Sequence, residues 1–329
     1  MNTNRLVDRF GRKHNYLRIS VTDRCNLRCV YCMPHEGIEW KKRDELLSFE
    51  EIIRVARVFA QMGIDKIRLT GGEPLVRKNL DVLIEQLALI DGIKTVAMTT
   101  NATLLAPIAK HLRQIGLKAL NISLDTFDAE RFYKIARRDD LQTVLDGINA
   151  ALEADFESLK LNMVVMAGVN DDEVMDFVDF AKDKKMNVRF IEYMPFKDNL
   201  WNPEKVVTFA DMRARIQEKY KLSPIQTEPS AVAKDFAIEG YTGTVSFISS
   251  MSDSFCGSCN RLRLTADGSI KSCLFFPAET NLRARLRAGL TDEALEEIIQ
   301  ETLALKPEAH PPAELIAEAE NRAMIEIGG

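Results

Sequence analysis

The sequence has no long apolar segment. Its 329 residues contain no run of about 18 apolar residues, so we expect no membrane span. The first twelve residues are polar and charged and lack the apolar stretch of a secretory signal, which predicts a cytoplasmic location. The formal net charge is −5, so the chain also lacks the broad positive charge typical of proteins that bind nucleic acid.

Cysteine is absent from a long stretch in the middle of the chain, and the six cysteines fall into two groups of three. The groups are Cys25, Cys29 and Cys32, and Cys256, Cys259 and Cys273. Disulfide frameworks belong to short secreted chains. A long chain without an export signal is therefore expected to use both groups as ligands of a metal or of an iron–sulfur cluster.

Strand-like and helix-like segments alternate over the first two thirds of the chain. We expect strands at residues 16–21, 66–70, 95–100, 119–124, 159–165 and 188–193. We expect helices at residues 48–62, 80–90, 104–115, 128–136, 141–154 and 171–184, the first of them opened by a capping box of Ser48 and Glu51. Six alternating β/α units favour a parallel sheet. Because six units are too few for a closed eight-stranded barrel, we predict an α/β fold with a partial (βα)6 barrel and ligands at the carboxyl ends of its strands.

The pattern changes after about residue 196, where prolines interrupt it. Short strand-like pieces follow at 244–248 and 261–264, and a helix is expected near 294–305. We therefore predict a barrel at residues 1–195 and a C-terminal extension at residues 196–329 that carries the second cysteine group.

The first cysteine group has the spacing C-x3-C-x2-C and directly follows the first expected strand. Three thiolates can bind three irons of a [4Fe–4S] cluster and leave the fourth iron open. The alternative is a structural zinc site in which His35 supplies the fourth ligand.

A second motif, Gly71-Gly72-Glu73-Pro74, follows the second expected strand. Its glycines allow a close backbone approach, and Glu73 can accept a hydrogen bond from an ammonium group. With the cysteine motif, it resembles the radical S-adenosylmethionine (SAM) superfamily, in which the cluster cleaves SAM to a 5′-deoxyadenosyl radical. The resemblance implies SAM contacts from Tyr31, Gly72, Glu73, Ser123 and Met194.

The second group, C-x2-C-x13-C, again provides three cysteines where a closed site needs four. A zinc ribbon remains an alternative, but no histidine lies close by in the sequence. We favour a second cluster with an open iron.

Basic residues recur on the expected strands. They are Arg18, Lys66, Arg68, Lys160, Arg189, Arg261 and Arg263. Charged side chains on interior strands are costly unless they are paired, and arginine binds phosphate through two parallel hydrogen bonds. For any one of them a solvated or salt-bridged position is an alternative. Together they predict a site for a polyphosphate.

The two-cluster arrangement resembles one branch of the superfamily, the GTP 3′,8-cyclase family of molybdenum cofactor biosynthesis. The segments that carry the resemblance are residues 17–25, 68–74, 189–194 and 255–263, and the terminal Gly328-Gly329. It implies GTP contacts from Arg18, Arg68, Thr99, Lys160, Arg261, Leu262 and Arg263. It also implies catalytic roles for Arg18, Gly328 and Gly329, and removal of the ribose 3′ hydrogen followed by bond formation to guanine C8.

The family resemblance also implies partners: a reductant protein such as flavodoxin or ferredoxin, a downstream cyclic pyranopterin monophosphate synthase, and a homodimer as one assembly open to the chain. Two other readings remain, a radical SAM enzyme acting on a peptide and a zinc protein without catalytic activity. One departure stands out: the family commonly has Thr-Asn-Gly where this chain has Thr100-Asn101-Ala102. If the backbone there needs a positive φ, the alanine is strained.

Overall fold

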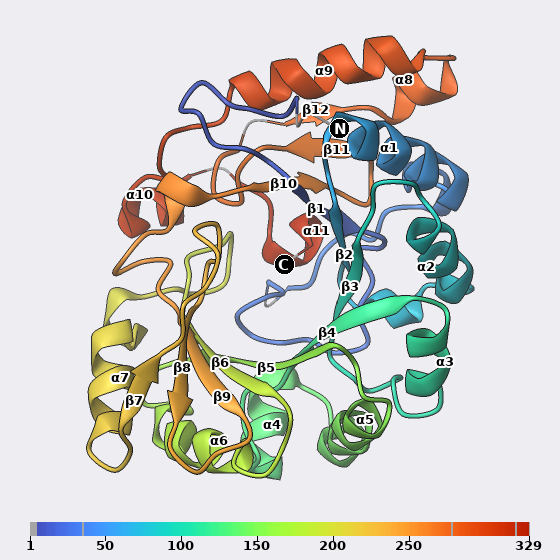
Figure 1. The fold of residues 1–329 in the computed structure, drawn as a ribbon. Helices are drawn as coiled ribbons and strands as arrows, with labels where there is room; N and C mark the ends of the chain where they lie inside the picture. Colours follow the sequence, from blue (N-terminus) through green and yellow to red (C-terminus); the bar gives the residue numbers. More distant parts are fainter. Residues whose placement is uncertain (1–4, 35, 278, 320, 329) are drawn as a thin grey trace.

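A single open sheet organises the molecule. The computed structural model describes residues 5–34, 36–277, 279–319 and 321–328. Within these residues, twelve strands form one sheet in the order β12-β11-β10-β1-β2-β3-β4-β5-β6-β9-β8-β7. Helices cover the outer face of the curved sheet, and the C-terminal end of the chain lies on its inner side (Figure 1).

The six predicted barrel strands lie side by side in chain order, and all are parallel. They are β1 (Tyr16–Ser20), β2 (Lys66–Thr70), β3 (Thr95–Thr100), β4 (Leu117–Ser123), β5 (Ser158–Val165) and β6 (Asn187–Glu192). The sheet does not close on itself, because its order ends in two different edge strands. The prediction of a partial, open α/β barrel is confirmed.

Helices connect these strands and cover the outer face of the sheet (Figure 1). They are α1 (Phe49–Met62), α2 (Leu80–Ala88), α3 (Ala109–Gln114), α4 (Ala129–Ala136), α5 (Leu141–Glu153) and α6 (Val174–Phe180). The predicted capping box opens α1: Ser48 accepts from the Glu51 amide, and Glu51 accepts from the Ser48 amide. The helix α3 is shorter than predicted because Pro107 has no N–H and disfavours helix in the residue before it.

The region after residue 195 extends both edges of the same sheet. Its strands are β7 (Leu222–Pro224), β8 (Lys234–Ile238), β9 (Thr244–Ile248), β10 (Arg261–Leu264), β11 (Ser269–Lys271) and β12 (Thr280–Asn281). The strand β9 pairs in parallel with β6, and β10 pairs in parallel with β1. The other four strands are antiparallel and form the two edges. The division at residue 195 remains a prediction.

Five further helices follow the barrel. They are α7 (Phe209–Gln217), α8 (Arg283–Arg287), α9 (Asp292–Ala304), α10 (Ala313–Glu318) and α11 (Met324–Ile327). The short helix α11 lies on the inner side of the sheet, beside the carboxyl ends of the first strands (Figure 1).

Alternation along the strands separates the core from the interior of the barrel. In β1, Leu17 and Ile19 are fully buried in the main hydrophobic core, whereas Arg18 between them lies on the opposite face. This period of two brings polar side chains into the interior of the barrel.

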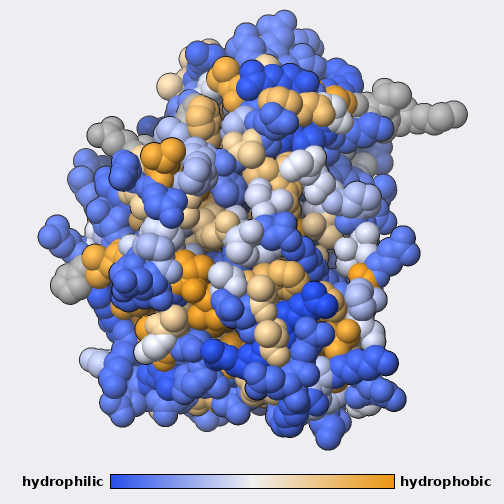
Figure 2. Space-filling view, turned by 90° about the vertical axis from the view of Figure 1, so that its left-hand side faces the viewer, coloured by the Kyte–Doolittle hydropathy of each residue, from blue (hydrophilic) through white to orange (hydrophobic). Residues whose placement is uncertain are grey.

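No helix of the described residues is long and apolar enough to cross a membrane. On the face shown in Figure 2, hydrophilic residues cover the upper and lower parts, and hydrophobic residues gather toward the middle.

Candidate active site

A cavity of about 520 Å³ lies within the barrel, a size typical of small-molecule sites. It brings together most of the residues predicted from the sequence. Those that line it are Arg18, Tyr31, Lys66, Arg68, Thr99, Ser123, Lys160, Arg189, Met194, Cys256, Cys259, Arg261, Arg263 and Cys273. The predicted cations and three of the predicted SAM contacts therefore face one cavity, together with the second cysteine group. Gly72, Glu73 and the first cysteine group do not line it.

Strand register places the cations in rows. Arg18 on β1 lies level with Arg68 on β2 and with Arg263 on β10. Two residues earlier on β1, Tyr16 lies level with Lys66 on β2 and with Arg261 on β10. Neighbouring strands are about 4.8 Å apart, so like charges in such a row repel one another unless an anion lies between them.

Burial and this repulsion both lower the pKa values of the cations. Burial and the neighbouring arginines lower the pKa of Arg18 to about 9, and burial with Arg189 nearby lowers the pKa of Lys160 to about 7. The Nε atoms of Arg261 and Arg263 are buried and have no hydrogen-bond partner among the described residues. Unpaired buried donors are costly, so the cavity is suited to a ligand with several anionic oxygens.

Tyr16 holds one of the arginines in place. Its hydroxyl accepts from Arg68 Nε at 2.5 Å, and Arg68 also donates to the Met98 carbonyl at 2.9 Å. Burial raises the pKa of Tyr16, but Arg68 and Arg18 outweigh it and lower the pKa to about 7. A phenol so close to two guanidinium groups partly balances their charge.

The first cysteine group lies on the loop after β1, next to α4. The Arg28 and Val30 amides donate to the carbonyls of Ala136 and Ile135, which fixes this loop against the end of the helix. Burial raises the pKa of Cys25 to about 11 and that of Cys32 to about 12. Negative neighbours, Glu73 for Cys25 and Cys25 for Cys32, contribute to both shifts. These thiols need a positively charged partner such as iron to ionise.

The two glycines of Gly71-Gly72 allow one loop to pack on another. A Cβ on Gly72 would lie 2.3 Å from the Arg24 carbonyl oxygen, and one on Gly71 would lie 2.5 Å from the Thr22 carbonyl oxygen. The close approach that we expected toward a ligand is thus made to the backbone that leads into Cys25. The Gly72 amide donates to the Thr22 carbonyl at 2.8 Å and ties the two loops together.

Glu73 is buried and joins the loops after β2 and β3. Its carboxylate accepts from the Asn101 amide at 2.7 Å, from the Thr100 hydroxyl at 2.8 Å and from the Leu75 amide at 3.0 Å. Burial raises its pKa to about 7. Its role toward an ammonium group remains a prediction.

Tyr31 connects the cysteine loop with the cavity. Its hydroxyl donates to Asp125 Oδ2 at 2.8 Å, and its carbonyl accepts from Asn199 at 3.2 Å. Asn199 also donates to the Met194 carbonyl at 2.9 Å, so it holds two of the predicted SAM contacts together. Burial raises the pKa of Asp125 to about 6.

The second cysteine group has the opposite electrostatic surroundings. Burial raises the pKa of Cys259, but Arg261 and Lys306 outweigh it and lower the pKa to about 6. The positive surroundings favour the thiolate that binds iron.

Each cysteine group supplies three thiolates, the donor set of a [4Fe–4S] cluster with one open iron. All six cysteines are free thiols. No three His, Cys, Asp or Glu side chains among the described residues converge as ligands of one metal ion would. A zinc ion needs its ligands gathered at about 2.0–2.3 Å, whereas a cube of four irons takes one thiolate at each corner. His35, the proposed fourth zinc ligand, lies outside the described residues.

The C-terminal tail reaches the carboxyl ends of β1 and β2. Gly328 has a φ of 81°, and a Cβ there would lie 2.7 Å from both Ser20 Cβ and Thr70 Oγ1. Met324 on α11 lines the cavity. The tail therefore lies beside the cavity up to Gly328, and its catalytic role remains a prediction. Gly329 lies outside the described residues.

The sequence departure at Ala102 lies at a position where the backbone does have a positive φ. Ala102 is fully buried with a φ of 62°, in the left-handed region. Its Cβ and carbonyl oxygen lie where a side chain on Gly147 of α5 would stand, at 2.9 and 2.3 Å from a Cβ built there. Gly147 thus makes room for the methyl group that the family's glycine lacks.

One predicted substrate residue does not face the cavity. The Leu262 side chain is 1% exposed and belongs to the main core, as alternation between Arg261 and Arg263 requires. Conversely, sequence reasoning missed several polar residues that line the cavity, namely Tyr16, Asn121, Asp125, Asn162 and His310. Residues two positions apart on a strand share a face, so Asn162 could have been found from its spacing to the predicted Lys160.

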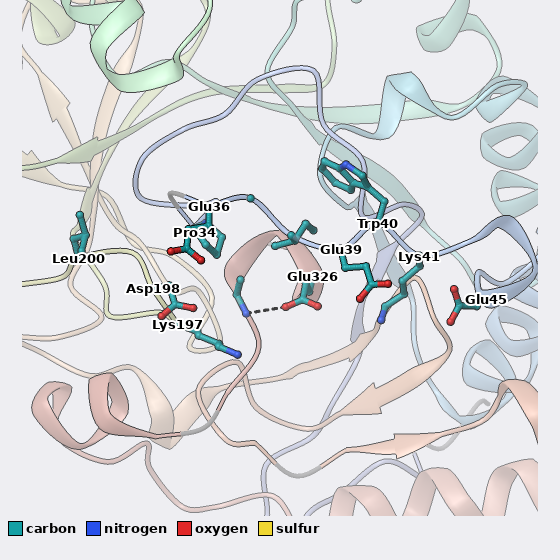
Figure 3. A pocket seen from close by; sticks show the side chains of 13 residues that line it. Pro34, Glu36, Glu39, Trp40, Lys41, Glu45, Lys197, Asp198, Leu200 and Glu326 are labelled. Atoms are coloured by element: carbon teal, nitrogen blue, oxygen red, sulfur yellow. Dashed lines mark hydrogen bonds between the residues drawn. The ribbon is translucent and has the colours of Figure 1, made fainter.

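A second hollow of about 640 Å³ lies on the other side of the tail. Ala323 and Glu326 line it, together with residues 36–41 and the loop at Lys197 and Asp198 (Figure 3). Glu326 accepts from the Ala323 amide at 3.1 Å. Since Met324 lines the central cavity, α11 forms a wall between the two hollows.

Comparison with known proteins agrees with this geometry. Residues 19–181 match the radical SAM superfamily, and residues 186–312 match the family described as Molybdenum Cofactor Synthesis C. The crystal structure of Streptococcus suis SuiB superposes with a TM-score of 0.61 at 16% identity, over 94% of this chain and 75% of that one. This likeness supports the fold alone.

Two curated relatives are much more similar in sequence. The mitochondrial GTP 3′,8-cyclase of Arabidopsis thaliana is 48% identical over 98% of this chain and 83% of its own length. Molybdenum cofactor biosynthesis protein 1 of Dictyostelium discoideum is 47% identical over 98% of this chain, which spans about half (52%) of that relative. The chain therefore belongs to the radical SAM superfamily and, within it, to the family of the GTP 3′,8-cyclases.

Proposed function

We propose that the chain converts GTP to 3′,8-cyclo-7,8-dihydro-GTP, the first step of molybdenum cofactor biosynthesis. One observation carries the proposal: the rows of cations on β10, β1 and β2 cross a cavity that also holds the second cysteine group. A nucleoside triphosphate matches both parts, because its phosphates are polyanionic and its base is a flat group with several ligand atoms. The relatives named as cyclases support the choice of GTP.

When bound, SAM and two [4Fe–4S] clusters, held by Cys25, Cys29 and Cys32 and by Cys256, Cys259 and Cys273, supply the radical chemistry. The chain's own residues bind and orient. Arg18, Arg68, Arg261 and Arg263, together with Lys160 and Thr99, bind the triphosphate, so that the base lies toward the second cysteine group. Rigid placement of the ribose against the SAM site supplies much of the rate enhancement.

The remaining site residues hold SAM and close the cavity. We assign Tyr31, Gly72, Glu73, Ser123 and Met194 to SAM, and the backbone of Leu262 to the substrate. Met324 and Gly328 place the tail between the cavity and the second hollow, where it excludes water. Gly329 is assigned to the same tail.

The partners follow from this function. A one-electron carrier such as flavodoxin or ferredoxin supplies electrons, and a cyclic pyranopterin monophosphate synthase consumes the product. We retain the cytoplasmic location and the homodimer as predictions that fractionation and sedimentation can test.

A single anaerobic experiment tests the function. Protein reconstituted with iron and sulfide is supplied with SAM and a reductant, and 5′-deoxyadenosine is quantified with GTP, with ATP and without nucleotide. Formation that depends on GTP, together with a cyclised nucleotide, supports the proposal. Equal formation under all three conditions contradicts the choice of substrate, and no formation from a fully loaded protein contradicts the radical chemistry.

A further inference from the structure

Two buried cations lie behind the second cysteine group, outside the cavity. Arg12 belongs to the N-terminal segment, and Lys306 follows α9. They are 8% and 2% exposed, and neither lines the central cavity. They are therefore not explained by binding of the substrate phosphates.

Lys306 bonds to the backbone next to two of the three cysteines. Its Nζ donates to the Arg261 carbonyl at 3.1 Å, two residues after Cys259. It also donates to the carbonyl of Ser272, the residue before Cys273. One side chain thus ties together the two chain segments that carry these cysteines.

Arg12 bonds to the segment of the third cysteine. Its guanidinium donates to the Cys256 carbonyl at 2.8 Å and to the carbonyls of Glu308 and Pro307 at 2.7 Å. The same guanidinium pairs with Asp8 at 2.6 Å, so its charge is balanced. Through Pro307 and Glu308, Arg12 also fixes the turn that follows Lys306.

The charge of Lys306 has no such balance within the described part of the chain. No described carboxylate lies within 4.0 Å of its Nζ, whereas most other buried cations here have a partner or line the cavity. A buried, unpaired ammonium group is costly. Burial lowers the pKa of Lys306, and the thiolates of Cys259 and Cys273 are the negative groups that oppose this shift.

We propose that Lys306 is a positioning residue for the second cluster, holding the segments of Cys259 and Cys273 and supplying the positive charge that balances their thiolates. This inference rests on the proposed function, because it assumes a cluster at this group. Arg12 holds the segment of Cys256 in the same way, and we call Lys306 and Arg12 together the clamp. A positive charge beside a cluster also favours its reduced form, so Lys306 raises the reduction potential of the second cluster.

The test uses the full chain with Cys25, Cys29 and Cys32 replaced by serine, so that only the second cluster is present. In this background Lys306→Gln keeps a hydrogen-bond donor but removes the charge, and Lys306→Arg keeps the charge. Lys184→Gln is the matched control, because Lys184 donates to the Phe180 carbonyl on the far side of the fold. Readouts are iron retained during titration with a chelator and the reduction potential followed by electron paramagnetic resonance.

Changes in the partners of metal ligands typically weaken metal binding about 10- to 100-fold. We expect a loss of this size and a more negative potential in Lys306→Gln, with Lys306→Arg and Lys184→Gln close to the parent. A Lys306→Gln protein with the parent's iron affinity and potential would overturn the clamp. If the parent itself binds no cluster, the assignment of the second cysteine group fails and the clamp fails with it. Should Lys306→Gln not fold, Arg12→Lys is measured in the same way, and unchanged iron affinity there counts equally against the clamp.

Discussion

Replacing Gly328 with alanine should weaken the docking of the C-terminal tail without unfolding the barrel. Gly328 has a φ of 81° and a ψ of 89°, a conformation that costs a residue with a side chain about 1–3 kcal/mol. The new Cβ would also lie 2.7 Å from Ser20 Cβ and Thr70 Oγ1. We take about 2 kcal/mol as the combined penalty on the docked tail, which is about a 30-fold shift toward the undocked state.

Two buried isoleucines help to hold the tail. Ile325 and Ile327 are each 1% exposed, and burying such a side chain contributes about 1.5–3 kcal/mol. The penalty of the substitution therefore offsets a third or more of what these two side chains contribute. The rest of the core is untouched, so the free energy of global unfolding should change little.

Hydrogen exchange of the amides of residues 323–328 measures docking, and formation of cyclised nucleotide measures function. Gly240→Ala is the control, because Gly240 has a φ of 78° but no atom within 4 Å of a new Cβ. We expect faster exchange in the tail and lower activity only in Gly328→Ala. If both variants match the wild type in tail exchange and in product formation, the reasoning about tail docking is refuted.

Three further predictions concern the second cluster, the phosphates and a buried histidine. Cys256→Ala should still cleave SAM but form no cyclised product, and full cyclase activity would contradict the role of the second cysteine group. Arg263→Ala should weaken GTP binding about 10- to 150-fold, because a hydrogen bond to a charged group contributes about 1.5–3 kcal/mol; equilibrium dialysis would show unchanged affinity if the anion site is misplaced. Burial, with Lys306 nearby, lowers the pKa of His14 to about 4, so between pH 6.5 and 4 the unfolded chain binds the extra proton and stability falls as the pH falls. From pH 7 to pH 5 this amounts to about 2 kcal/mol, which urea unfolding should show in the wild type and not in His14→Gln.

Much of the barrel could be predicted from local signals. Alternation and the capping box at Ser48 located the six parallel strands and the helix α1. The same signals missed β11 and β12, which are short and depend on partners far along the chain. They also missed α11, four residues long, whose position is set by contact with Ser20 and Thr70 rather than by its own sequence.

The candidate site divided in a similar way. Cysteine spacing and recurring basic residues identified the second cysteine group and the cations that face the cavity, because the type of residue alone indicates that a side chain can bind metal or phosphate. The sequence could not show that Gly72 serves packing against Arg24, since that contact joins two loops. Nor could it show the roles of Tyr16 and Lys306, since a tyrosine and a lysine are unremarkable until their neighbours are known.

The pairing of β1 with β10 has a consequence for synthesis of the chain. Residues 16 and 261 are partners in the sheet. One edge of β1 therefore stays unpaired until the chain has been synthesised as far as β10. At about 5–20 residues per second, this interval is roughly 12 to 50 s. Exposed strand edges invite aggregation, and a charge that points inward is one protection against it. Arg18, in the middle of β1, provides such a charge. The residue that we propose binds phosphate in the folded enzyme therefore also disfavours aggregation of the incomplete chain.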